Sequence, residues 1–130
     1  MFKQLQNLDN KSLAIAAEVL YLLNLLLFPG LAFVVLAFLY LSTRATIQPL
    51  ALNHLSQTLG VSVLGGSLLV VVLGLVFLFG NFDSPYTWVG IVFYFTFVHS
   101  ALIFMGIFGL IKALNEEHFV FPVLGRMFRA

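Results

Sequence analysis

Two long stretches of the chain, residues 55–79 and 86–111, contain no Asp, Glu, Lys or Arg. An α-helix rises 1.5 Å per residue, so about 20 apolar residues cross the roughly 30 Å hydrocarbon core of a bilayer. Each stretch is therefore long enough for one transmembrane helix. The whole chain is only 8% charged, whereas a soluble domain carries roughly 25% and needs it to cover a water-facing surface. The sequence predicts an all-α integral membrane protein.

A third apolar stretch, residues 13–41, is harder to interpret. It contains one charged residue, Glu18, and it holds Pro29 and Gly30 near its middle. As one helix it would be longer than the hydrocarbon core is thick. Proline removes a backbone donor and disturbs the preceding turn. The break is therefore either a kink in one tilted helix or the tip of a hairpin of two short helices.

The distribution of basic residues favours the hairpin. Cytoplasmic loops are enriched in Lys and Arg, and a hairpin puts all six basic residues on one side: Lys3, Lys11, Arg44, Lys112, Arg126 and Arg129. The loop 80–85, on the other side, has none. We expect a bundle of about four segments, near 13–28, 30–43, 55–79 and 86–114, with both termini cytoplasmic. The arm 30–43 is short for a full crossing and is expected to be re-entrant or to thin the bilayer.

The segments between and after these helices are expected to lie at the membrane surface. Ile47, Leu50 and Ala51 recur at helical spacing, with Gln48 and Asn53 on a polar side. This pattern predicts an interfacial helix over about 45–54 and a cytoplasmic tail over 115–130. The whole chain, 1–130, forms one domain. The first apolar segment is too long for a cleaved secretory signal and is expected to stay as a membrane anchor.

The main polar candidates inside the expected membrane segments are Glu18, Asn24, Thr96, His99 and Ser100. Glu18 is interpreted as a carboxylate that reaches back to the interface, or as a pore-lining or partner-binding carboxylate paired across helices. Asn24 suits a helix–helix hydrogen bond. His99 is interpreted as a neutral imidazole bonded to a carbonyl or hydroxyl of another helix. Its alternatives are a proton relay and a ligand to a cofactor shared with another subunit.

The other histidines do not point to a metal site. His54 is expected at the cytoplasmic interface and His99 about 20 Å deeper, so one metal ion cannot bind both. His118 adjoins Glu116 and Glu117 and is expected to be solvated. The chain has no cysteine, no phosphate-binding loop and no nucleophile motif. We therefore expect no cofactor, no metal and no enzymatic activity. The net charge of +1 argues against nucleic acid as a partner.

Small residues recur at spacings of four and eight on the last two helices. They are Ser62, Gly66, Gly74, Gly109 and Ala113. Small residues at such spacing let helix backbones approach closely. The pattern indicates packing of these two helices against each other, or a seam with another membrane protein or a second copy.

The order of these landmarks resembles a family of small bacterial membrane proteins known only as a domain of unknown function. That family is distantly similar to the Tic-twenty component of the chloroplast protein-import machinery. The resemblance rests on the Pro29-Gly30 break, on the stretch Pro49–Ser56 and on the tail Ile111–Pro122. Glu116 stands near a family glycine, and Phe119 and Phe121 replace tyrosines. The resemblance implies a four-segment bundle with cytoplasmic ends and no catalytic residues.

The small size, the short loops and the many helix-packing features favour a non-enzymatic accessory or assembly subunit of a larger complex in a bacterial inner membrane. Its partners would be the lipid bilayer and other membrane proteins. The alternative is a transport or protein-conducting component, which the resemblance, Glu18 and His99 support.

Overall fold

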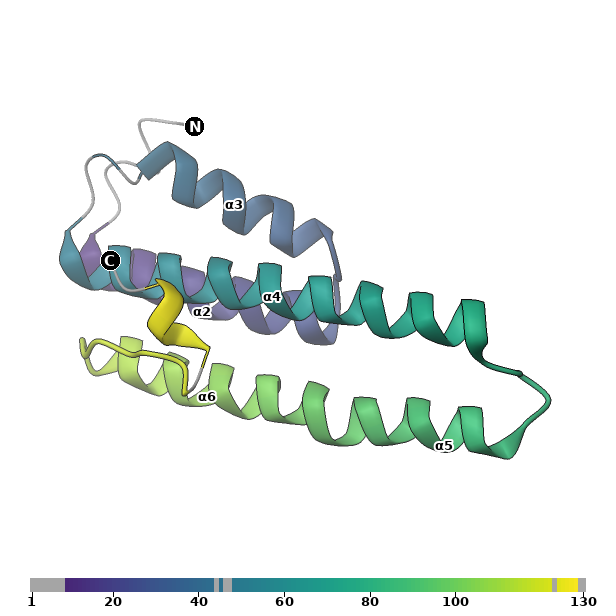
Figure 1. Ribbon diagram of the computed structural model, residues 1–130. Coiled ribbons are helices and arrows are strands. Elements are labelled where there is room, and N and C mark those ends of the chain that lie inside the picture. The colour runs from purple at the N-terminus through teal and green to yellow at the C-terminus, as the bar shows by residue number, and fades with distance from the viewer. Residues whose placement is uncertain (1–8, 44, 46–47, 123, 129–130) are drawn as a thin grey trace.

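The computed structural model describes residues 9–43, 45, 48–122 and 124–128. The regular structure in these ranges is helical: α2 (Asn10–Leu26), α3 (Leu31–Thr43), α4 (Pro49–Phe79), α5 (Pro85–Phe93), the π-helical turn η1 (Tyr94–His99), α6 (Ser100–Leu114) and the short 3-10 helix η2 (Gly125–Phe128). The elements α5, η1 and α6 form one rod, Pro85–Leu114. Figure 1 shows these rods running side by side. Helix α2 is central, because it contacts α3, α4 and α6.

The chain reverses direction at Pro29 and Gly30. The side-chain oxygen Oδ1 of Asn24 accepts a hydrogen bond of 2.9 Å from the backbone N–H of Gly30. Gly30 has a φ of 86°, a conformation that glycine adopts without steric cost. Helix α3 then runs back along α2 (Figure 1). The hairpin interpretation is confirmed, and a single kinked helix over residues 13–41 is wrong.

Two side chains at the start of α2 fix its position. Asp9 is the N-cap, and its carboxylate accepts from the backbone N–H of Ser12 at 2.6 Å. Hydrogen bonds from the side chain and the backbone of Ser12 hold the pKa of Asp9 below its usual value. Asn10 Oδ1 accepts from the backbone N–H of Ala51 at 2.7 Å. Helices α2 and α4 therefore begin at the same end of the bundle.

The expected interfacial helix over 45–54 is wrong as a separate element. Residues 44, 46 and 47 lie outside the described residues, and α4 runs without interruption from Pro49 to Phe79. The polar side of its first turns faces inward: Asn53, His54, Gln57 and Thr58 are all buried. The pattern was misleading because these polar groups find partners within the protein instead of at a membrane surface.

The four rods differ in length, and this decides where the core lies. Helix α4 has 31 residues and the rod Pro85–Leu114 has 30, so each is about 45 Å long. Helices α2 and α3 have 17 and 13 residues, about 25 and 20 Å. The hairpin therefore flanks only the first part of α4. The core is confined there, and includes Leu13, Leu36 and Leu55.

Gly66 and Gly74 of α4 do not pack against Gly109 and Ala113 of α6, as one of the two interpretations held. Gly109 lies against the Glu18 carboxylate of α2, where an added Cβ would be 2.5 Å from Oε2. Ala113 packs with Ala14 and Leu50. An added Cβ at Gly66 or Gly74 would meet nothing within 4 Å. Gly109 and Ala113 thus allow α2 to approach α6 closely, whereas Gly66 and Gly74 of α4 face open space.

This difference predicts opposite responses to one added methyl group. Gly109→Ala should destabilise the protein by about 1–3 kcal/mol, because it pushes on a buried carboxylate that cannot move freely. Gly66→Ala should be neutral or stabilising by up to about 1 kcal/mol, through helix propensity. Unfolding of both variants in detergent, followed by circular dichroism, measures the difference. Equal stability of the two variants would contradict the packing described here.

Candidate functional site

A buried carboxylate–imidazole pair joins α2 to α4. Glu18 Oε1 and His54 Nδ1 are 2.6 Å apart, and neither side chain has any exposed surface. The other ring nitrogen, Nε2 of His54, is 2.8 Å from the backbone carbonyl oxygen of Glu117, which follows α6. His54 therefore connects α2, α4 and the start of the tail in one hydrogen-bonded chain.

The partners of His54 define which protons the pair holds. A carbonyl oxygen only accepts, so Nε2 carries a proton and donates it to Glu117. The short contact between Nδ1 and Glu18 then needs a second proton, on the carboxyl group or on the ring. The pair with two protons is neutral overall, either as a carboxylic acid with imidazole or as a carboxylate with imidazolium. Either form keeps net charge out of the bundle interior, where an isolated charge is costly.

Glu18 also keeps one oxygen unused. Its Oε2 is buried and has no hydrogen-bond partner in the described protein. The missing side chain of Gly109 provides the space for this carboxyl group. Three residues further along α2, the buried Tyr21 donates from its hydroxyl to the carbonyl of Leu102 at 2.9 Å. Helix α2 thus presents two polar groups to the last rod from within the core.

Two more side chains of α4 hold the tail. Asn53 Oδ1 accepts from the backbone N–H of Phe119 at 2.8 Å. Gln57 accepts from the N–H of Phe121 at 3.1 Å and donates to the carbonyl of Gly125 at 2.7 Å. Residues 53, 54 and 57 lie on one face of a helix. The segment 117–121 needs these partners because it lies outside the helices, so no helix or strand satisfies its backbone groups.

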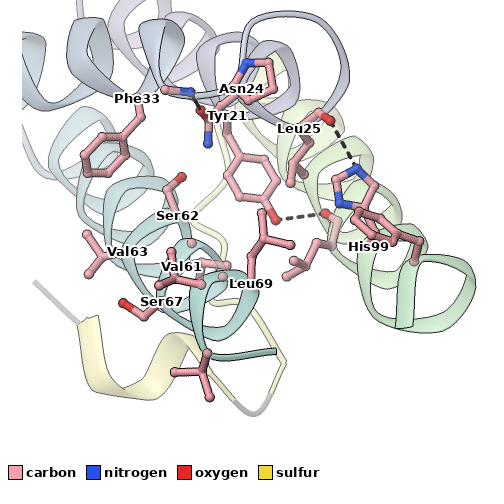
Figure 2. A pocket seen from close by; sticks show the side chains of 18 of the residues that line it. Tyr21, Asn24, Leu25, Phe33, Val61, Ser62, Val63, Ser67, Leu69 and His99 are labelled. Atoms are coloured by element: carbon pink, nitrogen blue, oxygen red, sulfur yellow. Dashed lines mark hydrogen bonds between the residues drawn. The ribbon is translucent and has the colours of Figure 1, made fainter. Parts of the chain in front are cut away.

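A cavity of about 810 Å³ lies beside this centre, towards the hairpin tip. Its walls are mainly apolar and come from the end of α2, the turn at Pro29, the middle of α4 and η1. Figure 2 shows Tyr21, Asn24, Ser62 and His99 among the residues around it. The Ser62 side chain is 8% exposed, and its hydroxyl has no partner in the described protein. The cavity thus combines a large apolar surface with a few uncharged polar groups.

His99 and Asn24 have structural contacts at the edge of the cavity. His99 Nε2 is 3.1 Å from the carbonyl oxygen of Leu25, as expected for an imidazole bonded across helices. Asn24 makes its bond within the hairpin, to Gly30, instead of between helices. Thr96 is exposed and Ser100 half-buried on the same rod. Among these, only Asn24 and His99 line the cavity.

Glu18 is the main correction to the sequence analysis. The interpretation as a carboxylate that reaches back to the interface is wrong, because Glu18 is fully buried. The alternative, a pair across helices, matches the geometry, with His54 as the partner. His54, which was expected at an interface, is fully buried within the bundle. The signal for it was a cluster of polar residues early in a long apolar helix, at 53, 54, 57 and 58.

The charged side chains and the histidine at the start of the tail are exposed. Glu116, Glu117 and His118 are exposed, and Lys112 Nζ bonds Glu117 Oε2 at 2.7 Å on the surface. Within the described ranges, no three His, Cys, Asp or Glu side chains gather in a group that could hold a metal ion.

The Glu18–His54 pair should account for a measurable part of the stability. Glu18→Ala and His54→Ala should each cost about 3–5 kcal/mol, because each leaves a buried polar group unpaired. The double variant should cost less than the sum, with a coupling energy of about 1–3 kcal/mol. The exposed pair Lys112–Glu117 is the control, and its coupling should be about 0–1 kcal/mol. Unfolding titrations in mixed detergent micelles measure both cycles, and additive effects at Glu18 and His54 would refute the coupling.

No protein-family model matches the chain, and comparisons with curated proteins and with solved structures find no match either.

Proposed function

We propose that the chain is a multi-pass protein of a bacterial inner membrane and acts as a non-enzymatic accessory or assembly subunit of a larger membrane complex. The observation that carries this proposal is the bare, apolar half of the two longest rods. Helix α4 and the rod Pro85–Leu114 contain stretches with mean hydropathies of 2.7 and 2.1, and only 11% of each stretch is buried in the protein. The core helix of a soluble protein would be mostly buried.

The exposed surface is suited to hydrocarbon rather than to water. Large apolar side chains at the far ends of the rods are open, including Phe77, Leu78, Phe79 and Tyr86. Patches of this kind on soluble monomers rarely exceed a few hundred Å². In a bilayer, lipid covers such surface, and helix association depends on close packing at small residues. Gly74 in α4 and Gly90 in α5 leave open space around their Cα atoms, which suits a partner helix.

The ends of the bundle differ in charge, which supports one orientation. Lys11 and Lys112 lie at the end where α4 begins, and the loop 80–84 at the other end holds Asp83 and no basic residue. By the positive-inside rule, the first end is cytoplasmic. Both termini would then be cytoplasmic, as the resemblance to the Tic-twenty-like family also implies.

Single-cysteine labelling tests this orientation, because the natural chain has no cysteine. Asp83→Cys should react with a membrane-impermeant maleimide added outside spheroplasts. Glu116→Cys should react only after the membrane is opened. Both positions are exposed in the protein, so the barrier to reaction is the bilayer. Labelling of both residues from the same side, or release of the protein by alkaline carbonate, would contradict the proposed membrane placement.

Photocrosslinking in cells tests the partner. Benzoylphenylalanine at Gly74 or Gly90 should give one adduct of defined mass, because both positions lie on the bare half of the rods. Gly74→Trp should reduce the adduct formed from position 90 at least ten-fold, since the indole blocks close approach. Benzoylphenylalanine at Val34, which is 62% exposed on α3, is the control and should give no such adduct. An adduct with a second copy of the chain would support self-association instead of a different partner.

A transport function is the second candidate, and the buried Glu18–His54 pair is the observation that favours it. Protonatable groups inside a membrane protein often mark an ion or proton path. Against this, the pair is sealed from both sides, and its groups hold the bundle and the tail together. Three results together would favour transport over the accessory function. The protein would be a monomer that gives no crosslinked adduct, it would conduct protons in liposomes, and Glu18→Gln would abolish this proton flux.

A further inference from the structure

The structure assigns a ligand to the cavity at the hairpin tip: we propose that it binds a neutral, long-chain amphiphile whose head group has a hydrogen-bonding oxygen. The inference relies on the membrane placement proposed above and is independent of the partner protein. The volume, about 810 Å³, falls within the range of roughly 300–1,000 Å³ that is typical of small-molecule sites.

The unsatisfied hydroxyl of Ser62 is the first indication of a ligand. Ser62 is more than nine-tenths buried, and its Oγ has no partner within the described residues. Figure 2 shows this hydroxyl turned towards Asn24 and Tyr21 across the cavity. Elsewhere in α4, the hydroxyls of Ser56 and Thr58 donate to the carbonyls of Leu52 and His54 in the preceding turn. The hydroxyl of Ser62 makes no such bond. A buried polar group without a partner costs about 1–3 kcal/mol, which a ligand oxygen would recover.

The polar groups around Ser62 select the chemistry of the head group. Asn24 uses its Oδ1 to accept from Gly30, which leaves its amide N–H groups as donors. His99 donates from Nε2 to a carbonyl, so its Nδ1 is an acceptor. The site thus offers donors at Asn24 and Ser62 and an acceptor at His99. A carbonyl or hydroxyl oxygen fits this set.

The walls exclude charged ligands and favour a chain. No Asp, Glu, Lys or Arg occurs among the described residues that line the cavity, so a phosphate or carboxylate head would lose its solvation without a counter-charge. Phe33, Val70 and Phe95 provide apolar walls. Val70 is 71% exposed, so the cavity opens on the side of α4.

The test is photolabelling of the purified full-length chain in phosphatidylcholine nanodiscs. The probe is hexadecanol with a diazirine in its chain, and the comparison probes are the corresponding carboxylate and the corresponding alkane. We expect saturable labelling of cavity residues by the alcohol, at least ten-fold above that by the other two probes. Unlabelled hexadecanol should compete. Equal labelling by the alkane would overturn the proposal, because it would mean ordinary contact with lipid chains.

Three variants locate the site. Ser62→Ala should weaken the apparent affinity about five-fold, the effect of one lost hydrogen bond. Gly66→Trp should reduce labelling at least ten-fold, because Gly66 lines the cavity and its Cβ position is free. Gly74→Trp is the matched control, since its Cβ position is also free but it does not line the cavity. The alcohol probe should label Gly74→Trp as strongly as it labels the unsubstituted protein. Loss of labelling in Gly74→Trp would overturn the proposal, because the effect of Gly66→Trp would then not be specific to the cavity.

Two competitors distinguish the natural sources of such a molecule. Unlabelled diacylglycerol represents bilayer lipids with a free hydroxyl, and an unlabelled isoprenoid quinone represents carriers with a carbonyl. Displacement of the probe by one of them, at least ten-fold more effectively than by the other, supports the proposal and identifies the source. If neither diacylglycerol nor the quinone displaces the probe, the proposal is wrong.

Discussion

The hydrogen bond between Glu18 and His54 fixes α2 against α4. The apolar residues of the two helices do not by themselves specify this alignment. Apolar helices slide and rotate against each other at little cost in hydrocarbon, because lipid solvates them as well as a neighbour does. A buried carboxyl group and a buried imidazole have one favourable arrangement, 2.6 Å apart. Once it forms, the register of α2 on α4 is set. Gly109 must then be small, and the carbonyl of Glu117 has a fixed donor.

The unequal lengths of the helices explain the rest of the architecture. Helix α2 ends at Leu26, where Asn24 and Gly30 turn the chain, so the far parts of α4 and α5 lack a third helix. The cavity lies at this boundary, with the hairpin tip as one wall. At this boundary the buried hydroxyl of Ser62 has no hydrogen-bond partner among the described residues, whereas a longer bundle could supply one. The ligand site and the bare partner surface proposed above both follow from the short hairpin.

The sequence predicted the helices well and the polar contacts poorly. Uncharged stretches place α4 and the last rod, and the Pro29-Gly30 break with the distribution of basic residues predicts the hairpin, because these signals need no knowledge of side-chain contacts. The pairing of Glu18 with His54 is not local. Either residue alone suits a membrane interface, and only the packing of α2 against α4 removes both from solvent. The same holds for Gly66 and Gly109, which share a spacing pattern but have different surroundings.

The two hydrogen bonds of His54 also set an order of assembly. Glu18 precedes His54 by 36 residues, whereas Glu117 follows it by 63. A chain made from its N-terminus has the carboxyl partner available as soon as α4 emerges, and domains generally form in the order of synthesis. The carbonyl partner arrives only after 63 further residues have been synthesised. Until then, one nitrogen of a buried ring faces no acceptor. The bundle therefore reaches its lowest free energy only after Glu117 has been synthesised, and a chain truncated before Glu117 retains an unsatisfied group at its centre.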